Sequence, residues 1–275
     1  MTLSPQEFEV YKDFLRDDSG LSIQYEQAYL LEARLAPIMR RMELSSIDDL
    51  TAMVRANNTA LKHEIIEVMT VHDTSFFRDI NVFNQLQNFI LPKIMEKKSV
   101  GSTIRIWCAA CSSGQEAYSI AIALKENAEK FAGYNFEIIA SDLSDAIVDT
   151  ARRGCYTQFE VQRGMPTHLL IKYFKQDGSD WIINDDIKSM VQFKTFNLLD
   201  SMDSMGTMDI ILCRNVLTYF DEEIKTRVLN ALYDCFDASS FLLLGTTEDV
   251  ATCSDKLKPM TDECGLYIPD NSPYL

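Results

Sequence analysis

The chain has 275 residues, of which 47% are hydrophobic, and this is enough apolar material for one large or two smaller packed domains. Its formal net charge of −15 at pH 7 opposes contact with a phosphate backbone, so we expect no nucleic-acid partner. No apolar run approaches the roughly 20 residues of a membrane span, and the first residues do not form a signal peptide. We therefore expect a cytoplasmic protein without direct membrane insertion.

The cysteines and histidines are few and scattered. Seven cysteines, an odd number, lie in apparent strands and helices, which is typical of reduced interior thiols. Cys108 and Cys111 form one C-x-x-C pair, but no second pair follows and the chain has only three histidines. Because a structural zinc ion needs four such ligands, we expect no metal site. The scarcity of histidine also counts against hydrolases that use a histidine base.

The first part of the chain is predicted to be helical. Ser4 and Glu7 have the spacing of a capping box, with Pro5 at the first helical position, and Gly20 is a stop signal. Apolar residues at intervals of three and four predict further helices over residues 24–42, 46–55 and 59–69. We expect an all-α bundle over residues 1–85.

From residue 103 onward, short apolar runs alternate with helical patterns. The runs are Ile104–Ala109, Phe136–Ala140, Met208–Cys213 and Phe241–Leu244. This alternation predicts an α/β domain with a parallel sheet over residues 86–275. Within it, turn signals and the strand-like pieces 181–183 and 190–196 predict a small antiparallel β insertion over residues 155–196.

The stretch from Arg105 to Ser119 combines a buried strand, a loop of small residues and a helix start. Small residues from Ala109 to Gly114 let a ligand approach the backbone closely. Glu116, near the helix start, offers a carboxylate to hydroxyl or ammonium groups. These features suit an adenosyl cofactor, and an ordinary βα turn explains the loop composition equally well.

Polar residues follow two more predicted strands. Asp142 ends the second strand, where an acidic residue commonly accepts hydrogen bonds from ribose hydroxyls. The alternative is an N-cap for a helix that begins near Ser144. Arg214, Asn215 and Tyr219 follow the strand that ends at Cys213. Polar groups at the carboxyl ends of parallel strands lie where α/β folds bind ligands.

The connection between the predicted bundle and the sheet contains the segment His72–Arg78, with two phenylalanines. Taken alone, the phenylalanines could simply be core and Arg78 could be solvated. Together with the other segments, however, this one closely resembles the CheR family of chemotaxis-receptor methyltransferases. The matching motifs are Thr74–Arg78, Trp107–Ser119, Ser141–Asp142, Asn197–Leu198, Cys213–Phe220 and Leu244–Glu248. The resemblance extends from about residue 4 to about residue 268.

The resemblance implies a Rossmann-like class I methyltransferase domain that transfers a methyl group from S-adenosylmethionine to glutamate side chains, leaving S-adenosylhomocysteine. It assigns cofactor binding to His72, Thr74, Arg78, Glu116, Asp142, Asn197, Leu198, Arg214 and Asn215. It also places Arg78 and Tyr219 against the reacting carboxylate as catalytic residues. In two places the chain departs from the family: His72 replaces a usual asparagine, and Ala110 replaces a frequent glycine. Both departures concern cofactor affinity more than function.

The implied partners are methyl-accepting chemotaxis receptors, whose methylated helices are rich in glutamate. An acidic enzyme needs a local positive face to approach such helices. We assign this role to Arg34, Arg40 and Arg41 of the second predicted helix. The alternative is that these arginines belong to an ordinary solvated helix face. The turn of the β insertion has a single glycine, Gly178, so we expect no dependence on a receptor-tail peptide. Competing functions are a non-catalytic adenosyl-binding regulator and a methyltransferase with another acceptor.

Overall fold

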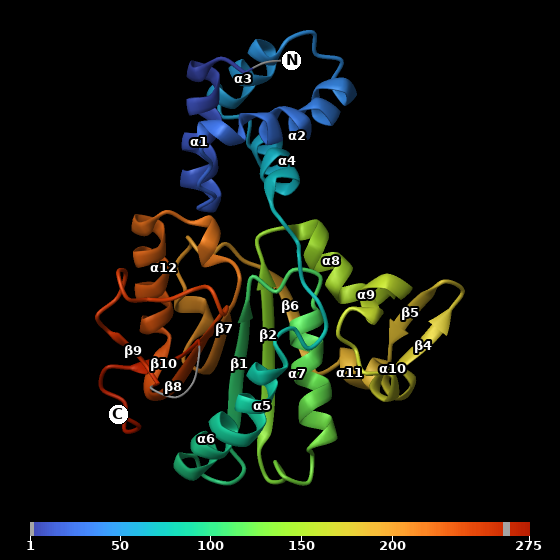
Figure 1. Ribbon diagram of the computed structural model, residues 1–275, viewed down its shortest axis with the longest axis vertical. Coiled ribbons are helices and arrows are strands. Elements are labelled where there is room, and N and C mark those ends of the chain that lie inside the picture. The colour runs from blue at the N-terminus through green and yellow to red at the C-terminus, as the bar shows by residue number, and fades with distance from the viewer. Residues whose placement is uncertain (1–2, 261–264) are drawn as a thin grey trace. The chain divides into compact units, whose positions relative to one another are not determined.

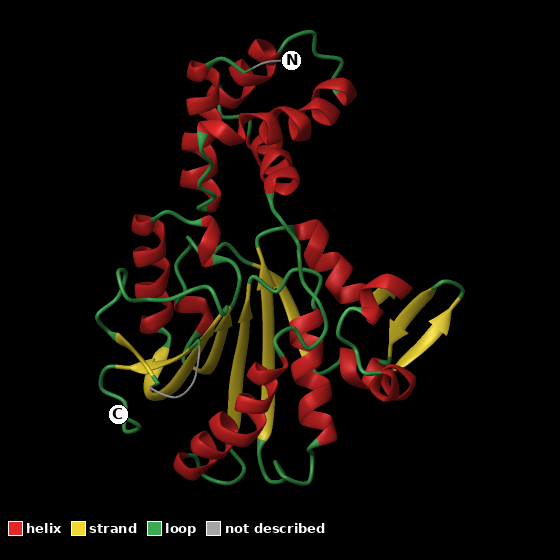
Figure 2. Ribbon diagram, viewed as in Figure 1, coloured by secondary structure: helices red, strands yellow, loops and turns green. Residues whose placement is uncertain are grey.

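The structure is a computed structural model that describes residues 3–260 and 265–275 (Figure 1). Helices predominate in the first part, and strands alternate with helices in the rest, as Figure 2 shows. Within the described residues, no helix is both long and apolar enough to cross a membrane.

The chain divides into two compact units. The first comprises Met1–Val71 and Thr218–Lys225, and the second comprises His72–Leu217 and Thr226–Leu275. This division lies earlier than the boundary after residue 85 that the sequence suggested. The reason is packing, because Phe76, Phe77 and Phe83 are buried in the hydrophobic core of the second unit.

The first unit is an all-α bundle, as expected. Its helices are α1 (Pro5–Ser19), η1 (Tyr25–Gln27), α2 (Ala28–Arg41), α3 (Ile47–Arg55) and α4 (Thr59–Met69). The predicted capping box of α1 is present, since Ser4 Oγ accepts a hydrogen bond from the Glu7 N–H and the Glu7 carboxylate accepts one from the Ser4 N–H. Gly20 ends α1 with a φ of 77°, in the left-handed region that favours glycine.

The second unit is built on one large sheet, which confirms the Rossmann-like α/β fold. Its strands lie in the order β6-β2-β1-β7-β8-β10-β9. Their bounds are β1 (Thr103–Ala109), β2 (Asn135–Asp142), β6 (Val191–Thr195), β7 (Met208–Cys213), β8 (Phe236–Leu244), β9 (Leu257–Pro259) and β10 (Leu266–Pro269). In this order, the five strands β6, β2, β1, β7 and β8 pair in parallel, whereas β10 is antiparallel to both β8 and β9. The sequence did not predict this antiparallel extension.

A second, three-stranded antiparallel sheet in the order β3-β5-β4 confirms the β insertion. The insertion comprises β3 (Cys155–Thr157), α9 (Gln158–Gln162), α10 (Thr167–Tyr173), β4 (Phe174–Asp177), β5 (Asp180–Ile183) and α11 (Asp185–Lys188). The expected range of 155–196 was too long at its end. The strand-like piece at 190–196 is β6, which pairs in parallel with β2 of the large sheet, for example Val191 with Ile138.

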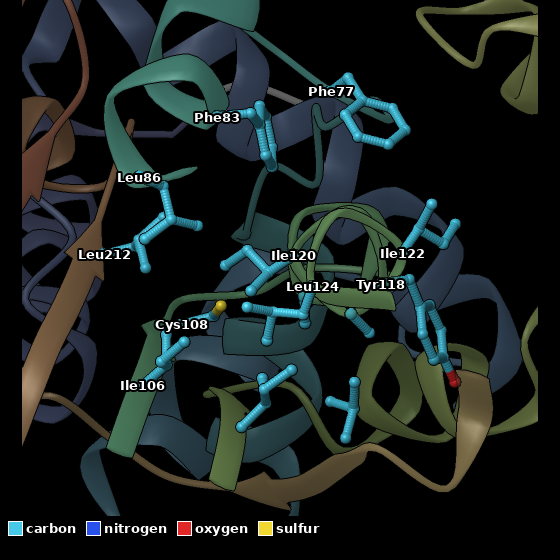
Figure 3. Close-up of a cluster of buried hydrophobic side chains, with 14 of the residues drawn as sticks. Phe77, Phe83, Leu86, Ile106, Cys108, Tyr118, Ile120, Ile122, Leu124 and Leu212 are labelled. Atoms are coloured by element: carbon cyan, nitrogen blue, oxygen red, sulfur yellow. The ribbon is translucent and has the colours of Figure 1, made fainter. Parts of the chain in front are cut away.

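Helices cover the large sheet. They are α5 (Ile80–Gln85), η2 (Leu86–Ile90), α6 (Leu91–Lys97), α7 (Gln115–Glu126), α8 (Asp145–Arg153) and α12 (Glu222–Asp234). The short turns η3 (Asp203–Met205) and η4 (Leu217–Tyr219) precede and follow β7 in the chain. Figure 3 shows part of one core, which contains Phe83 and Leu86, Ile120 of α7 and Ile106 of β1. This core packs α7 and β1 into one hydrophobic cluster.

Candidate cofactor-binding site

The loop between β1 and α7 has an unusual backbone. Ala110 and Ser112 have φ values of 58° and 52°, and Gly114 has a φ of 91°. For a residue with a side chain, the left-handed conformation costs roughly 1–2 kcal/mol, so surrounding contacts must hold it. One such contact is the hydrogen bond of 2.8 Å from the Cys111 N–H to the Ser141 carbonyl. The loop is therefore fixed against the end of the neighbouring strand β2.

Asp142 ends β2 and is buried beside this loop. Its carboxylate accepts hydrogen bonds from the N–H of Ser112 at 2.8 Å and from the N–H of Ser144 at 3.3 Å. Ser144, and not Asp142, is the N-cap of α8, because its hydroxyl accepts from the Ile147 N–H at 3.1 Å. Burial raises the pKa of Asp142, while the two N–H donors oppose the rise by stabilising the ionised form.

Ser112 itself has a buried hydroxyl without a hydrogen-bond partner among residues 3–260 and 265–275. Buried polar groups are nearly always paired, so an orphaned one beside a buried carboxylate indicates a place where a ligand's polar groups bind. The hydroxyl of Ser112 and the carboxylate of Asp142 together suit a ligand rich in hydroxyl groups.

Glu116, at the start of α7, is joined to Arg214, at the end of β7. Arg214 Nη1 lies 2.7 Å from Glu116 Oε2, and Arg214 Nη2 contacts the carboxylate of Asp79. The Arg214 side chain is 2% exposed and that of Glu116 is 13% exposed. The structure thus brings together two predicted residues and adds Asp79, which sequence reasoning missed although it directly follows Arg78 of the matched motif.

Asn215 is held by a residue that the sequence analysis did not select. Its backbone has a φ of 58°, and its N–H donates to Glu248 Oε2 at 2.7 Å. The same oxygen accepts from the Gly245 N–H at 2.8 Å. A Cβ on Gly245 would lie 2.7 Å from the side-chain amide of Asn215, so glycine is required there. The signal for Glu248 was present, since it closes the motif that begins at Leu244.

Asn197 and Leu198 follow β6 and lie next to the Asp142 region. The preceding Phe196 N–H donates to the Asp142 carbonyl at 2.8 Å. Asn197 Oδ1 accepts from the Leu199 N–H at 3.0 Å, which fixes the turn, and Leu198 is buried. This turn therefore borders the same strand end as the β1–α7 loop.

The segment from His72 to Arg78 enters the second unit. Its phenylalanines are core residues, as the simpler interpretation held, and the Phe77 N–H donates to Ser119 Oγ of α7 at 2.9 Å. Arg78 is not merely solvated, because its Nη1 donates to the Asp73 carbonyl at 2.8 Å. His72 and Thr74 are half-buried, and His72 is close enough to Asp142 to affect that carboxylate's ionisation.

Tyr219 lies in η4 and belongs to the first unit. It is half-buried, and its carbonyl accepts a hydrogen bond from the Ser22 N–H at 2.8 Å. Its contact with a reacting carboxylate stays a prediction.

The three arginines of α2 differ in their surroundings. Arg34 Nη1 donates to the carbonyls of Val68 and Met69 at 2.8 Å each, and so satisfies the C-terminal end of α4. Arg41 pairs with Glu64 at the surface, and Arg40 is exposed. Arg34 therefore has a structural role inside the first unit, and a role of this helix in substrate binding stays a prediction.

The cysteines of this region are buried thiols. Burial raises the pKa of both Cys108 and Cys111 well above the ordinary value, which makes these thiols unreactive. Across the residues with described coordinates, no group of three or more histidine, cysteine, aspartate or glutamate side chains could hold a metal ion.

Comparison with known proteins identifies two matching regions. Residues 6–70 match the family described as "CheR methyltransferase, all-alpha domain", and residues 72–265 match "CheR methyltransferase, SAM binding domain". The two matches meet at the boundary between the two structural units, after Val71.

Relatives of similar length are known. A chemotaxis protein methyltransferase from Vibrio parahaemolyticus is 34% identical over 262 residues, which cover 94% of each chain. Chemotaxis protein methyltransferase 1 from Pseudomonas aeruginosa is 32% identical and covers 93% of this chain and 94% of its own. Among solved structures, DszA carbon methyltransferase is 16% identical with a TM-score of 0.43, over 91% of this chain and 63% of that chain.

Proposed function

The chain belongs to the CheR family of S-adenosylmethionine-dependent methyltransferases, and from this premise we propose that it methylates glutamate side chains of methyl-accepting chemotaxis receptors. The relatives' names, which refer to chemotaxis, support this choice of acceptor. The observation that carries the proposal is the convergence of Asp142, Glu116 and Arg214 on the ends of three adjacent strands of one sheet.

The residues at this edge fit the cofactor. Asp142 offers a carboxylate to the ribose hydroxyls, and the orphaned hydroxyl of Ser112 lies in the same loop. Glu116, Asp79 and Arg214 carry two negative charges and one positive charge, which favours a ligand with cationic groups. When bound, S-adenosylmethionine supplies a methyl group that is activated by its positively charged sulfur.

The acceptor needs little chemical help. A glutamate carboxylate has an ordinary pKa of about 4.3 and is already ionised at pH 7, so no general base is required. The enzyme's residues have to orient the carboxylate and exclude water from it. We assign the steering of the carboxylate to the Arg78 guanidinium and its orientation to the neutral hydroxyl of Tyr219.

Receptor recognition is assigned to the surface of α2. Arg40 and Arg41 are exposed there and supply positive charge on a protein with a net charge of −15. Arg34 would contribute indirectly, by holding the end of α4. We also propose a cytoplasmic location and methylation without a receptor-tail tether.

The test is to incubate the protein with methyl-labelled S-adenosylmethionine and receptor-containing membranes. We expect a methyl ester on the receptor, which mild base releases as methanol, and much less label with Asp142→Ala at the same subsaturating cofactor concentration. Label that resists base would mean a different acceptor atom. Binding of S-adenosylhomocysteine in a calorimeter without any transfer would favour the non-catalytic regulator instead.

A further inference from the structure

Asp79 has an unusual backbone conformation and an unusual side-chain contact for an aspartate at the start of a helix. It is the residue before α5, with a φ of 58° in the left-handed region. An aspartate at this place normally accepts a hydrogen bond from the first turn, yet within the described chain the Asp79 side chain makes no such cap. Its carboxylate is bound to Arg214 instead. Asp79 therefore has a strained backbone conformation and does not cap the helix, while its carboxylate contacts Arg214. This combination indicates that the function of the side chain lies in its contact with Arg214.

Arg214 is a buried cation held between two carboxylates. Its Nη2 meets Asp79, its Nη1 meets Glu116 at 2.7 Å, and its Nε is buried without a partner in the described ranges. A guanidinium has a planar fork of donors, which pairs with a carboxylate through two parallel bonds when nothing competes. Asp79 competes with Glu116 for the same positive charge, since its carboxylate attracts Nη2 while Glu116 contacts Nη1.

We propose that Asp79 is a positioning residue for cofactor binding, acting through Arg214 on Glu116. With Asp79 on Nη2, Glu116 is paired through Oε2 alone, and no described residue is seen to donate to Oε1. Oε1 is then available to a cationic group of the ligand. Without the Asp79 charge, Arg214 is expected to draw Glu116 into a two-point contact that takes up both oxygens. The inference rests on the cofactor part of the proposed function.

The variant Asp79→Asn removes the charge and keeps the backbone, because asparagine tolerates the left-handed conformation. Asp186→Asn is the matched control, since Asp186 pairs with Lys125 at the surface of the same unit. We expect Asp79→Asn to raise the calorimetric Kd for S-adenosylhomocysteine about tenfold, and the control to stay within about twofold of wild type. The KM for S-adenosylmethionine should rise with this Kd, while kcat and the KM for receptor stay unchanged.

A double-mutant cycle tests the route through Glu116. If Asp79 acts on Glu116, then Asp79→Asn combined with Glu116→Gln should bind no more weakly than Glu116→Gln alone. Asp79→Glu, which retains the charge, should bind within about threefold of wild type, and it replaces Asp79→Asn if thermal unfolding shows that the asparagine variant does not fold.

The inference is overturned if Asp79→Asn binds S-adenosylhomocysteine like wild type, or if Asp79→Glu loses as much affinity as Asp79→Asn. It is also overturned if the fold-loss of affinity in the double variant equals the product of the fold-losses in Asp79→Asn and Glu116→Gln. These outcomes do not depend on the acceptor, because calorimetry with S-adenosylhomocysteine needs none. A wild-type protein that binds the cofactor but esterifies no receptor would contradict the proposed function alone.

Discussion

Gly164, in the β insertion, lies against the segment that leads into the candidate cofactor-binding site. It has a φ of 91°, and a Cβ built on it would lie 2.0 Å from the carbonyl oxygen of Phe76. Phe76 has no freedom to retreat, because its ring is fully buried and packs edge-on against Tyr156 and Phe174 at centroid distances of 5.0 and 5.5 Å. Gly164→Ala should therefore destabilise the second unit.

The size of the effect follows from two costs. A side chain in the left-handed region costs about 1–2 kcal/mol. Forcing an extra carbon into a packed site typically costs about 1–3 kcal/mol more, so we expect a loss of about 2–5 kcal/mol. Gly178→Ala is the matched control: its φ is 60°, but no described atom lies within 4 Å of the added carbon. It should show the first cost only.

Urea unfolding followed by tryptophan fluorescence measures this difference. The chain has two tryptophans, Trp107 and Trp181, and both belong to the second unit. Because Phe76 lies between Thr74 and Arg78, Gly164→Ala should also weaken S-adenosylhomocysteine binding in calorimetry. If Gly164→Ala destabilises the protein no more than Gly178→Ala, the close backbone contact does not exist as described and the reasoning is refuted.

Four further predictions concern three single side chains. Asp142→Ala should cost roughly 2–3 kcal/mol of cofactor affinity in calorimetry, because the Asp142 carboxylate would no longer accept two charge-assisted hydrogen bonds from the ribose hydroxyls. In the wild type, that affinity should fall on acidification at a pH above the ordinary carboxylate range, since burial raises the pKa of Asp142 and the ribose hydroxyls bind its ionised form. Tyr219→Phe should lower the rate of receptor methylation and leave calorimetric cofactor affinity nearly unchanged. Burial raises the pKa of Tyr11 to about 12, so its contribution to stability, about 2–3 kcal/mol, is complete below pH 10 and is lost as the pH rises towards 12; Tyr11→Phe should flatten this part of the pH–stability curve in thermal unfolding.

Each of these has a contrary outcome. Unchanged affinity in a folded Asp142→Ala protein would remove Asp142 from the site. An affinity for cofactor that is independent of pH down to the ordinary carboxylate range would contradict the role of its ionised form. Wild-type turnover by Tyr219→Phe would exclude the orienting hydroxyl. Equal alkaline slopes for Tyr11→Phe and wild type would show that Tyr11 ionises as freely in the folded state as in the unfolded one.

The sequence by itself determined the elements that depend on neighbours along the chain. The capping box at Ser4 and the stop at Gly20 bound α1 as predicted, because both act through hydrogen bonds within a few residues. β7 was recognised with its observed ends, Met208 and Cys213, because five of its six residues are apolar, as expected for a strand that is buried on both faces. The ordered motifs were equally local, and they sufficed to indicate the family.

Only the tertiary structure decided which distant residues meet. The alternating sequence of β6 (Val191–Thr195) fits either sheet, and its pairing with β2 is what assigns it to the large one. Likewise, nothing near Asp79 or Glu248 in the chain reveals that the first reaches Arg214 and the second holds Asn215. These contacts join residues more than 30 positions apart. They arise because parallel strands bring their carboxyl ends to one edge, where buried charges must find partners in space rather than along the sequence.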